Sequence, residues 1–516
     1  GGTRRMDPCD PPKDANTALQ QQQQQQQPLL SVDSQSPKSR MQATGQQPCC
    51  GCHCHCPDVI FAFLFLAQLG AIIFIGVWGL ENEESMEGSS HPEDAIQFRH
   101  WPDYLNFFTL GSFLGLAIAL LLMVLARFTP RFILALSVFG SLSLVLGGGV
   151  VLLLLKQFYA GAAVCAVALL GVFIMTFWAS HALRFSSEFL VMGTKALFSN
   201  TGIFLVALLV LIIQLAFTAL LLFALFSLMA RDCSEQRGCS YRPLNWLMLL
   251  PYFWAMEVLC SILHMSVAGA VGSFYFFQRC GTTSSNTQGE SIPSLRAFGR
   301  ALSGSFGSIC FGSLLVGCFS FLHSLAVFAR TKRTCAGGCF RCLCCVCQVM
   351  MSCIETLLGL FNRYAFTHMA LYGTSYMDSS RNAYRLIQQR GLTPIANDAM
   401  TFFVPILGGL FTGGFTAAGS YAYMKWDGSF NQKEILVVAV SGGLLTFQVA
   451  LLVLSMLSSA VTSFFVSFAE QPSILEDTQP VLFQELYERI GDQGNGDDLT
   501  SDLTRNKTNK RSSPSP

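Results

Sequence analysis

Long runs of hydrophobic residues alternate with short polar connections along most of the chain. A bilayer core about 30 Å thick needs about 20 helical residues to cross it. Ten stretches meet this length, at residues 59–80, 104–126, 132–155, 158–180, 202–229, 245–277, 303–329, 346–374, 399–424 and 435–467. Glu355, Asn362 and Arg363 interrupt the eighth, for which an interfacial or re-entrant segment is the alternative. The pattern predicts an all-α polytopic membrane protein, with about ten transmembrane helices in one bundle over residues 59–470.

The two ends of the chain lack such runs. Residues 1–58 carry a glutamine run among Pro and Ser residues, and so little apolar surface cannot offset the entropy of ordering. Residues 491–516, rich in Asp, Asn, Ser and Pro, predict a second disordered tail. Between this tail and the last span, residues 471–490 predict an amphipathic surface helix. Its apolar positions are Leu475, Val481, Leu482, Leu486 and Ile490.

Lysine and arginine in the short connections predict the orientation, because they gather on the cytosolic side. With a cytosolic N-terminus, the acidic connection after the first span lies outside, and most basic connections lie inside. Both termini are therefore expected in the cytosol. The connection with Arg330, Lys332 and Arg333 disagrees, because ten full crossings place it outside.

Composition excludes several classes of protein. Hydrophobic residues make up 52% of the chain and charged residues 12%, which argues against an ordinary soluble globule. The 32 Lys and Arg residues nearly balance 31 Asp and Glu residues, so no large basic surface is available for nucleic acid. Phosphate-loop, nucleophile-elbow and H-E-x-x-H motifs are absent from the sequence. We therefore expect no enzyme and no cofactor.

Cysteines concentrate in two tracts beside the spans, at 49–56 and 335–347. Neither tract has the separated paired halves of a structural zinc site, and we predict no metal centre. S-acylation is the favoured interpretation of the first tract, with metal binding and no modification as alternatives. Its cysteines are Cys49, Cys50, Cys52, Cys54 and Cys56. Cys233 and Cys239 share a connection expected outside the cell, where either a disulfide or two free thiols is possible.

The sixth span places an acid deep in apolar sequence. At 100° per residue, one arc of roughly 80° holds Trp254, Glu257, Ser261, His264, Ala268, Gly272 and Tyr275. A charge facing lipid at this depth costs at least about 2.5 kcal/mol, so the face should point into the bundle or a water-filled path. A carboxylate beside aromatic rings suits a quaternary ammonium ion. A structural Glu257, protonated or paired with His264, is the alternative.

Polar residues also recur along one face of the eighth span. The same arithmetic groups Glu355, Asn362, Phe366, Met369 and Gly373. Asn362 is a candidate for lining a substrate path, and Tyr364 and Tyr372 are candidate rings for a cation. Hydrogen bonding between helices, packing or interface anchoring are the alternatives for these residues.

Several long motifs occur in an order that resembles the choline transporter-like family. They are FWAMEVLCSILHMSVAGAVGSFYFF, SGSFGSICFGSLL at 303–315, FNRYAFTHMALYGTSYMDSSRNAYRLIQQRG at 361–391 and FAEQPSILEDTQPVLFQELYERI after the last span. The ALYG motif, the Y-x-x-(S/A)-(S/A)-(K/R) run and the pair Asn397-Asp398 look most like the fungal-type pH-nine-sensitive branch. The resemblance covers roughly residues 59–490.

This resemblance implies a ten-span carrier of the plasma membrane that moves choline or a similar organic cation without ATP. Trp254 and Glu257 match the family's aromatic-x-x-acid, and Asn362, Tyr364 and Tyr372 match its eighth-span asparagine and aromatics. The chain departs from the family at two places. Only about 23 residues separate its first two spans, and Phe274-Tyr275 stands where a Trp-Tyr pair is frequent.

Together these observations lead to a functional hypothesis. We expect a facilitative or proton-coupled carrier of choline-like cations, in which Glu257 supplies charge and the aromatic residues supply ring faces. Ser261 and Asn362 complete the expected site, and His264 is a candidate for proton coupling. The alternatives are another cargo, such as ethanolamine, a thiamine derivative or a lipid, and a membrane scaffold without transport.

Overall fold

The computed structural model describes residues 58–83, 101–154, 158–235, 247–277, 293–331, 338–390, 393–428, 432–478, 480–481 and 483–484. Within these ranges all of the regular structure is helical. The long helices are α3 (Val59–Glu83), α4 (Trp101–Phe128), α5 (Pro130–Leu154), α6 (Phe158–Ser199), α7 (Gly202–Glu235), α9 (Leu249–Phe277), α11 (Phe306–Thr331), α12 (Gly338–Tyr372), α14 (Thr393–Asp427) and α15 (Gln432–Glu470). The shorter ones are α10 (Pro293–Ser303), α13 (Tyr376–Arg390) and α16 (Pro472–Thr478). Both predicted disordered tails lie outside the described residues.

Each of the ten predicted spans coincides with one long helix. Eight of these helices, α3, α4, α5, α7, α9, α11, α14 and α15, contain a stretch long and apolar enough to cross a membrane. The chain is therefore an all-α polytopic membrane protein. The fourth and eighth predicted spans correspond to α6 and α12, and α12 runs as one helix of 35 residues. That these two also cross the membrane stays a prediction.

Several helices extend beyond the predicted spans. The α6 helix has 42 residues, which at about 1.5 Å per residue is roughly twice the thickness of a bilayer core. Its last part, which the hydrophobic pattern assigned to a connection, is helical and packs Phe189 against Phe464 and Phe465 of α15. The seventh predicted span begins at residue 303, whereas in the structure a turn at Gly304 and Ser305 separates α10 from α11, which begins at Phe306.

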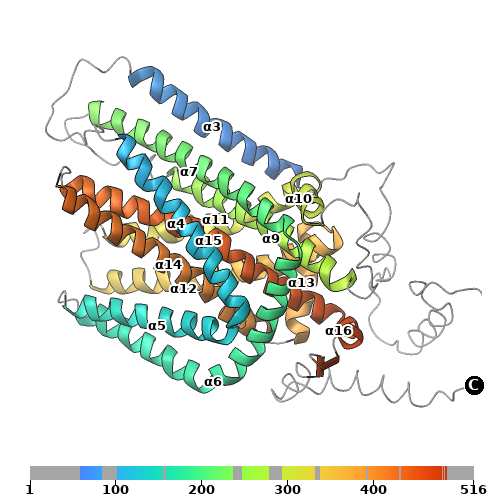
Figure 1. Cartoon of the computed structure of the whole chain (residues 1–516). Helices are drawn as coiled ribbons and strands as arrows, with labels where there is room; N and C mark the ends of the chain where they lie inside the picture. The colour runs from blue at the N-terminus through green and yellow to red at the C-terminus, as the bar shows by residue number, and fades with distance from the viewer. Residues whose placement is uncertain are drawn as a thin grey trace, which may run out of the picture.

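The bundle consists of two groups of helices that meet along α9 and α15 (Figure 1). The α7, α10, α11 and α12 helices pack against α9, with α3 against α7 and α11. The α4, α6 and α14 helices pack against α15, with α5 against α6 and α14. The α9 helix is the most enclosed of the eight apolar spans, with 83% of its apolar window buried. Polar residues on α9 therefore face other helices, and their partners decide what they can do.

Glycine ends two of the long helices. Gly373 follows α12 with φ +65° and Gly428 follows α14 with φ +71°, in the left-handed region that glycine adopts without steric cost. Their amides donate to Met369 and Met424 carbonyls at 2.9 and 3.3 Å. Gly373 thereby turns the chain from α12 into the amphipathic α13.

The α16 helix occupies the start of the predicted surface helix. It begins at Pro472, the position that proline favours at a helix start. Leu475 is buried and Val481 is 81% exposed. Leu482, Leu486 and Ile490 lie outside the described residues, so the full extent of this helix stays a prediction.

Candidate functional site

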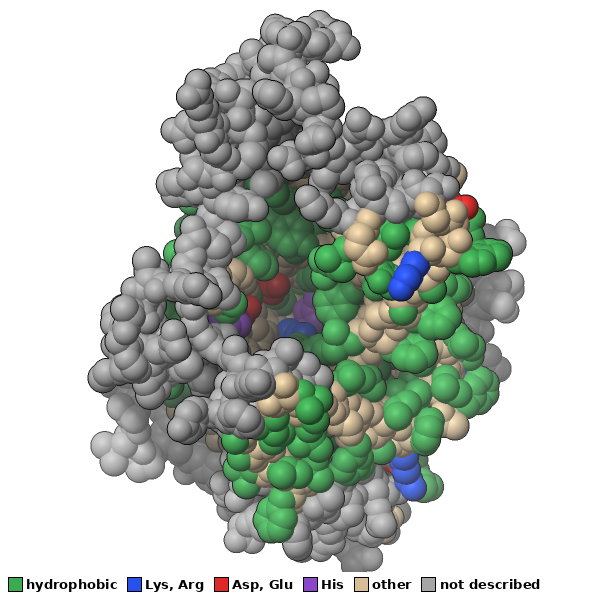
Figure 2. All heavy atoms as spheres, turned by 90° about the vertical axis from the view of Figure 1, so that its left-hand side faces the viewer, with side chains coloured by type: hydrophobic (Ala, Val, Ile, Leu, Met, Phe, Trp, Pro, Cys, Tyr) green, Lys and Arg blue, Asp and Glu red, His purple; other side chains and the backbone are tan. Residues whose placement is uncertain are grey.

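A hollow opens on the face that lies at the left-hand side of Figure 1, and acidic, basic and histidine side chains lie deep inside it (Figure 2). This end of the bundle holds the ends of α7 and α11 and the starts of α9 and α12 (Figure 1). Ten full crossings place these connections outside the cell, and the basic connection between α11 and α12 is the one that disagrees with the charge rule. We refer to the space between α9, α11, α12 and α15 as the hollow. Five charged and imidazole side chains of these helices interact with one another: Glu355 with His323, Glu257 with Glu355 and Arg363, and His264 with the Arg363 carbonyl.

Glu257 is the acid of the α9 helix. Its side chain is partly exposed although α9 is the most enclosed span, so it faces open space inside the bundle. Within the described part of the chain no hydrogen bond or ion pair engages its carboxylate. The charged residues whose fields reach it are Arg363 and Glu355 of α12. Glu257 therefore presents a carboxylate whose lone pairs no described side chain satisfies.

Arg363 supplies the positive charge of the hollow and links α12 to the second helix group. Its guanidinium donates to Ser458 Oγ of α15 at 2.8 Å and lies 5.2 Å above the ring of Phe402 on α14. These contacts hold the guanidinium at the junction of the two helix groups. A cation in the hollow consequently meets Arg363 as a fixed charge of the same sign.

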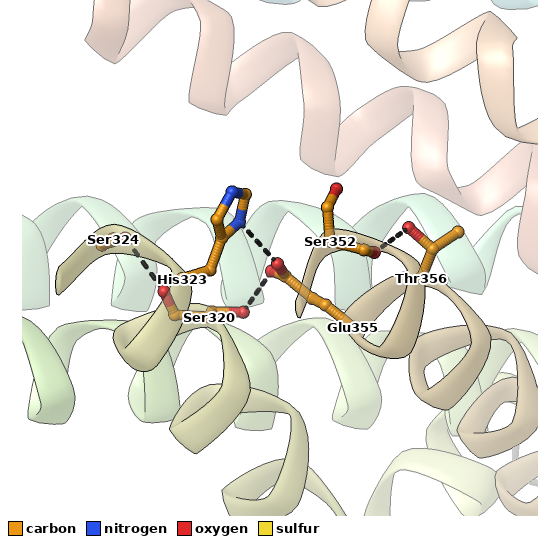
Figure 3. A network of polar contacts seen from close by, with 6 residues as sticks. All are labelled: Ser320, His323, Ser324, Ser352, Glu355 and Thr356. Carbon is orange, nitrogen blue, oxygen red and sulfur yellow. Dashed lines mark hydrogen bonds and ion pairs between the residues drawn. The ribbon is translucent and has the colours of Figure 1, made fainter. Parts of the chain in front are cut away.

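A second carboxylate, Glu355 of α12, is held by two donors from α11 (Figure 3). Ser320 Oγ donates to Oε1 at 2.5 Å, and His323 Nδ1 lies 2.9 Å from Oε2. The His323 and Glu355 side chains are 27% and 28% exposed. Unlike Glu257, this carboxylate has both oxygens engaged.

His264 closes the hollow at the middle of α9 by joining three helices. Its Nε2 donates to the Arg363 carbonyl of α12 at 3.0 Å, and Nδ1 lies 2.9 Å from Ser459 Oγ of α15. Thr367 Oγ1 is also 3.0 Å from Nε2. A neutral imidazole with the proton on Nε2 satisfies this arrangement, because Nδ1 then accepts from Ser459. Glu257 is not a partner of His264, so the alternative in which these two residues pair does not fit the geometry.

Ser261 and Asn362 hold α11 against its neighbours. Ser313 Oγ of α11 donates to Ser261 Oγ at 3.0 Å. Asn362 donates to the Gly312 carbonyl at 2.8 Å and accepts a hydrogen bond from the Tyr376 hydroxyl of α13. Burial raises the pKa of the Tyr376 hydroxyl above its ordinary value, which keeps it protonated as the donor. The amide group of Asn362 is thus committed at both ends.

The three predicted rings lie in different parts of the bundle. Trp254 is buried, donates from Nε1 to the Cys310 carbonyl at 3.0 Å and packs edge-on to Phe65. Tyr364 is fully buried. Tyr372 sits at the end of α12, where its hydroxyl is 3.4 Å from Glu470 Oε2. Trp254 and Tyr372 thus have hydrogen-bond partners on α11 and α15, and their role in a cation site stays a prediction.

Contacts among α9, α12 and α15 close the opposite half of the hollow. Tyr275 donates to the Gln471 carbonyl at 2.9 Å, and His368 Nε2 lies 3.7 Å from Glu470 Oε1. Gly272 of α9 lies directly against the Leu371 side chain of α12, which would have to shift to admit a Cβ. These contacts lie near the ends of α9, α12 and α15, at the end of the bundle away from the opening of the hollow (Figure 1).

A separate cavity of about 580 Å³ lies between α4 and α14. Asn106 and Asp427 supply polar groups, and Phe107, Phe415 and Tyr423 supply rings to its described lining. Asp427 is the single charged side chain in that lining. Because α9, α11 and α12 contribute nothing to this cavity, it is distinct from the hollow.

Sequence reasoning missed the partners that organise the hollow. The apolar pattern shows Arg363 only as an interruption of the eighth span, and it does not indicate that His323 and Ser320 pair with Glu355. An ionisable residue within an apolar window was the available signal for both Arg363 and His323. The cysteine side chains expected to be acylated or disulfide-bonded lie outside the described residues. Among the residues that the structure describes, no cluster of His, Cys, Asp or Glu could hold a metal ion.

A polytopic helical bundle with a polar, charged hollow between two helix groups defines a protein of the membrane transporter class. Comparison with known sequences names the family. The chain belongs to the choline transporter family, because the family described as plasma-membrane choline transporter matches residues 163–473. The predicted resemblance is confirmed.

Fungal relatives share much of the length of the chain. Protein PNS1 of Debaryomyces hansenii is 25% identical over 448 residues, covering 84% of this chain and 86% of the relative. Protein PNS1 of Cryptococcus neoformans var. neoformans serotype D is 28% identical over 469 residues, covering 84% and 82%. Protein PNS1 of Mycosarcoma maydis is 31% identical over 248 residues, covering 46% and 44%. These relatives agree with the predicted pH-nine-sensitive branch.

Proposed function

We propose that this protein is a carrier of choline or a related monovalent organic cation, facilitative or proton-coupled, in the plasma membrane. The cation binds in the hollow with its charge against Glu257. One observation carries the proposal: a partly exposed carboxylate lies inside the most enclosed helix, and no described side chain pairs with it. An ionised acid at this depth needs a counter-charge.

The hydrogen-bonding pattern favours a quaternary ammonium over a primary amine. A quaternary ammonium donates no conventional hydrogen bond, and a primary ammonium needs several acceptors. Asn362, the expected second acceptor, is occupied by Gly312 and Tyr376. Glu257 therefore offers a negative charge without a second free acceptor from Asn362, and this combination suits a choline-like cation.

The two helix groups suggest how such a carrier works. Arg363, His264 and Gln448 make hydrogen bonds across the junction of the groups, and Gln448 of α15 donates to the Tyr252 hydroxyl of α9. Rocking of one group against the other exposes a central site to each side in turn. Opening the closed half requires separation of Tyr275 from Gln471 and of His368 from Glu470.

Uptake into liposomes tests the proposal. Purified protein is reconstituted, and entry of radiolabelled choline is measured against liposomes without protein. The proposal predicts saturable entry that unlabelled choline suppresses more strongly than ethanolamine at equal concentration. Entry no faster than in empty liposomes, with folded and inserted protein, would reject a choline carrier and favour another cargo or a scaffold.

A further inference from the structure

The His323–Glu355 pair combines an exposed imidazole with a fully engaged carboxylate. Figure 3 shows the His323 ring and the Ser320 hydroxyl of α11 pointing at the Glu355 carboxylate of α12. Both members of the pair are about one-quarter exposed, in contrast to the buried His264 and His368. Part of this imidazole is therefore accessible from outside the packed core.

The geometry allows His323 to gain or lose a proton without rearrangement. In the neutral ring, Nδ1–H donates to Glu355, and in the charged ring the same contact becomes an ion pair at 2.9 Å. Within the described residues the Nε2 atom has no hydrogen-bond partner, so a proton can enter there. Ser320 donates to the other carboxylate oxygen in both states.

The groups around His323 determine what its protonation does. Glu355 of α12 contacts His323 directly, and Glu257 of α9 interacts electrostatically with Glu355 and with Arg363 of α12. The α9 helix also carries the Tyr252 hydroxyl, which is bonded to Gln448. The α3 helix has no titratable side chain between residues 59 and 77. The hydrogen bonds of His264 are all satisfied by a neutral imidazole, which we take as its state here.

The charges of the hollow then match one monovalent cation. Two carboxylates, Glu257 and Glu355, face one guanidinium, Arg363. With His323 neutral, the described side chains leave one uncompensated negative charge, and with His323 protonated they leave none. We propose that His323, held by Ser320 and Glu355, is a proton-binding site whose occupation weakens cation binding at Glu257. This inference rests on the proposed function and assigns a regulating residue to the same hollow.

The pH dependence of choline binding tests the inference. Histidine as a class changes charge between about pH 5 and pH 8, so dissociation constants are measured near both limits. We expect wild type to bind choline about tenfold more weakly near pH 5 than near pH 8, because one nearby charge is neutralised. His323→Asn keeps an amide donor for Glu355 but removes the titration, and its two constants should agree within about twofold.

A matched variant controls for histidine removal in general. His368→Asn changes a histidine of α12 at the closed end and should keep the wild-type ratio between the two pH values. A wild-type ratio near one, or a ratio in His323→Asn equal to wild type, overturns the inference while the choline site stands. Absence of choline binding at both pH values rejects the proposed function and the inference together.

A measurement on wild type alone guards against misfolding of the variant. Calorimetry of choline binding near pH 6.5, the ordinary midpoint for histidine, is repeated in buffers with different ionisation enthalpies. Competition at His323 predicts that each choline bound releases a substantial fraction of one proton. Binding without proton release would overturn the inference whatever the variants show.

Discussion

Replacing Glu257 by Gln preserves the shape of the side chain and removes one charge from the hollow. A cation about 5 Å from this carboxylate gains about 3 kcal/mol at an effective dielectric constant near 20. Water in the hollow and the nearby Arg363 reduce this gain, so about 1.5–3 kcal/mol is expected. Since every 1.4 kcal/mol is tenfold in affinity, Glu257→Gln should weaken choline binding by about 10- to 150-fold.

The assay is equilibrium binding of labelled choline to purified protein near pH 8, with the melting temperature as a check on folding. Glu188→Gln is the matched control. Glu188 lies on α6 and pairs with the exposed Arg131 at 3.2 Å, so the same chemical change occurs outside the hollow. An exposed ion pair is worth about 0–1 kcal/mol, and choline affinity should not change.

The result is decisive because the competing explanation predicts the opposite. If Glu257 is a protonated structural residue, Gln replaces a neutral acid by a neutral amide and binding hardly changes. A folded Glu257→Gln protein with choline affinity within about twofold of wild type would refute the electrostatic reasoning.

Three further predictions concern the packing that shapes the hollow. In Gly317→Ala the new Cβ would lie 3.0 Å from the α9 backbone, so the free energy of unfolding, measured by chemical unfolding in detergent, should fall by about 1–3 kcal/mol. The control Gly359→Ala meets nothing within 4 Å, and its free energy of unfolding should rise by about 0.5–1 kcal/mol. Equal effects of the two substitutions would contradict the packing of α11 on α9. His264→Ala leaves the Ser459 hydroxyl without its imidazole partner and removes one of the two donors to the Arg363 carbonyl. It should cost about 1–3 kcal/mol in the same assay, and an unchanged stability would show that this junction contributes little. Tyr376→Phe removes one buried hydrogen bond and should lower stability by about 1 kcal/mol, with no loss if α13 is held by its ring contacts alone.

The spans were predictable because crossing a bilayer requires long apolar helices, which leave a direct pattern in sequence. The face of α9 was also predictable, since Glu257, Ser261 and His264 follow helical periodicity. Periodicity gives the direction of a side chain within one helix and says nothing about which neighbour it meets. The hydrogen bonds between His264 and Ser459 and between Trp254 and Cys310 join residues 195 and 56 positions apart.

The extent of α6 shows a different limit of the sequence. Its second half is less apolar than a span and contains Arg184 and Lys195, which favoured a connection. Tertiary packing overrides that pattern, because Phe189, Leu190 and Leu197 are buried in the bundle. The partners of Glu355 were hidden for a related reason, since α11 and α12 are separate spans and only their packing brings His323 beside it.

A cryo-electron microscopy map of the protein with saturating choline tests the central claim most directly. We expect density for one ligand in the hollow, with its ammonium against the Glu257 carboxylate. In a map of Glu257→Gln at a choline concentration that only just saturates the wild type, that density should be lost or much weaker, because the affinity is about 10- to 150-fold lower. Ligand density in the cavity between α4 and α14, or an empty hollow at saturating choline, would contradict the assignment of the cation site.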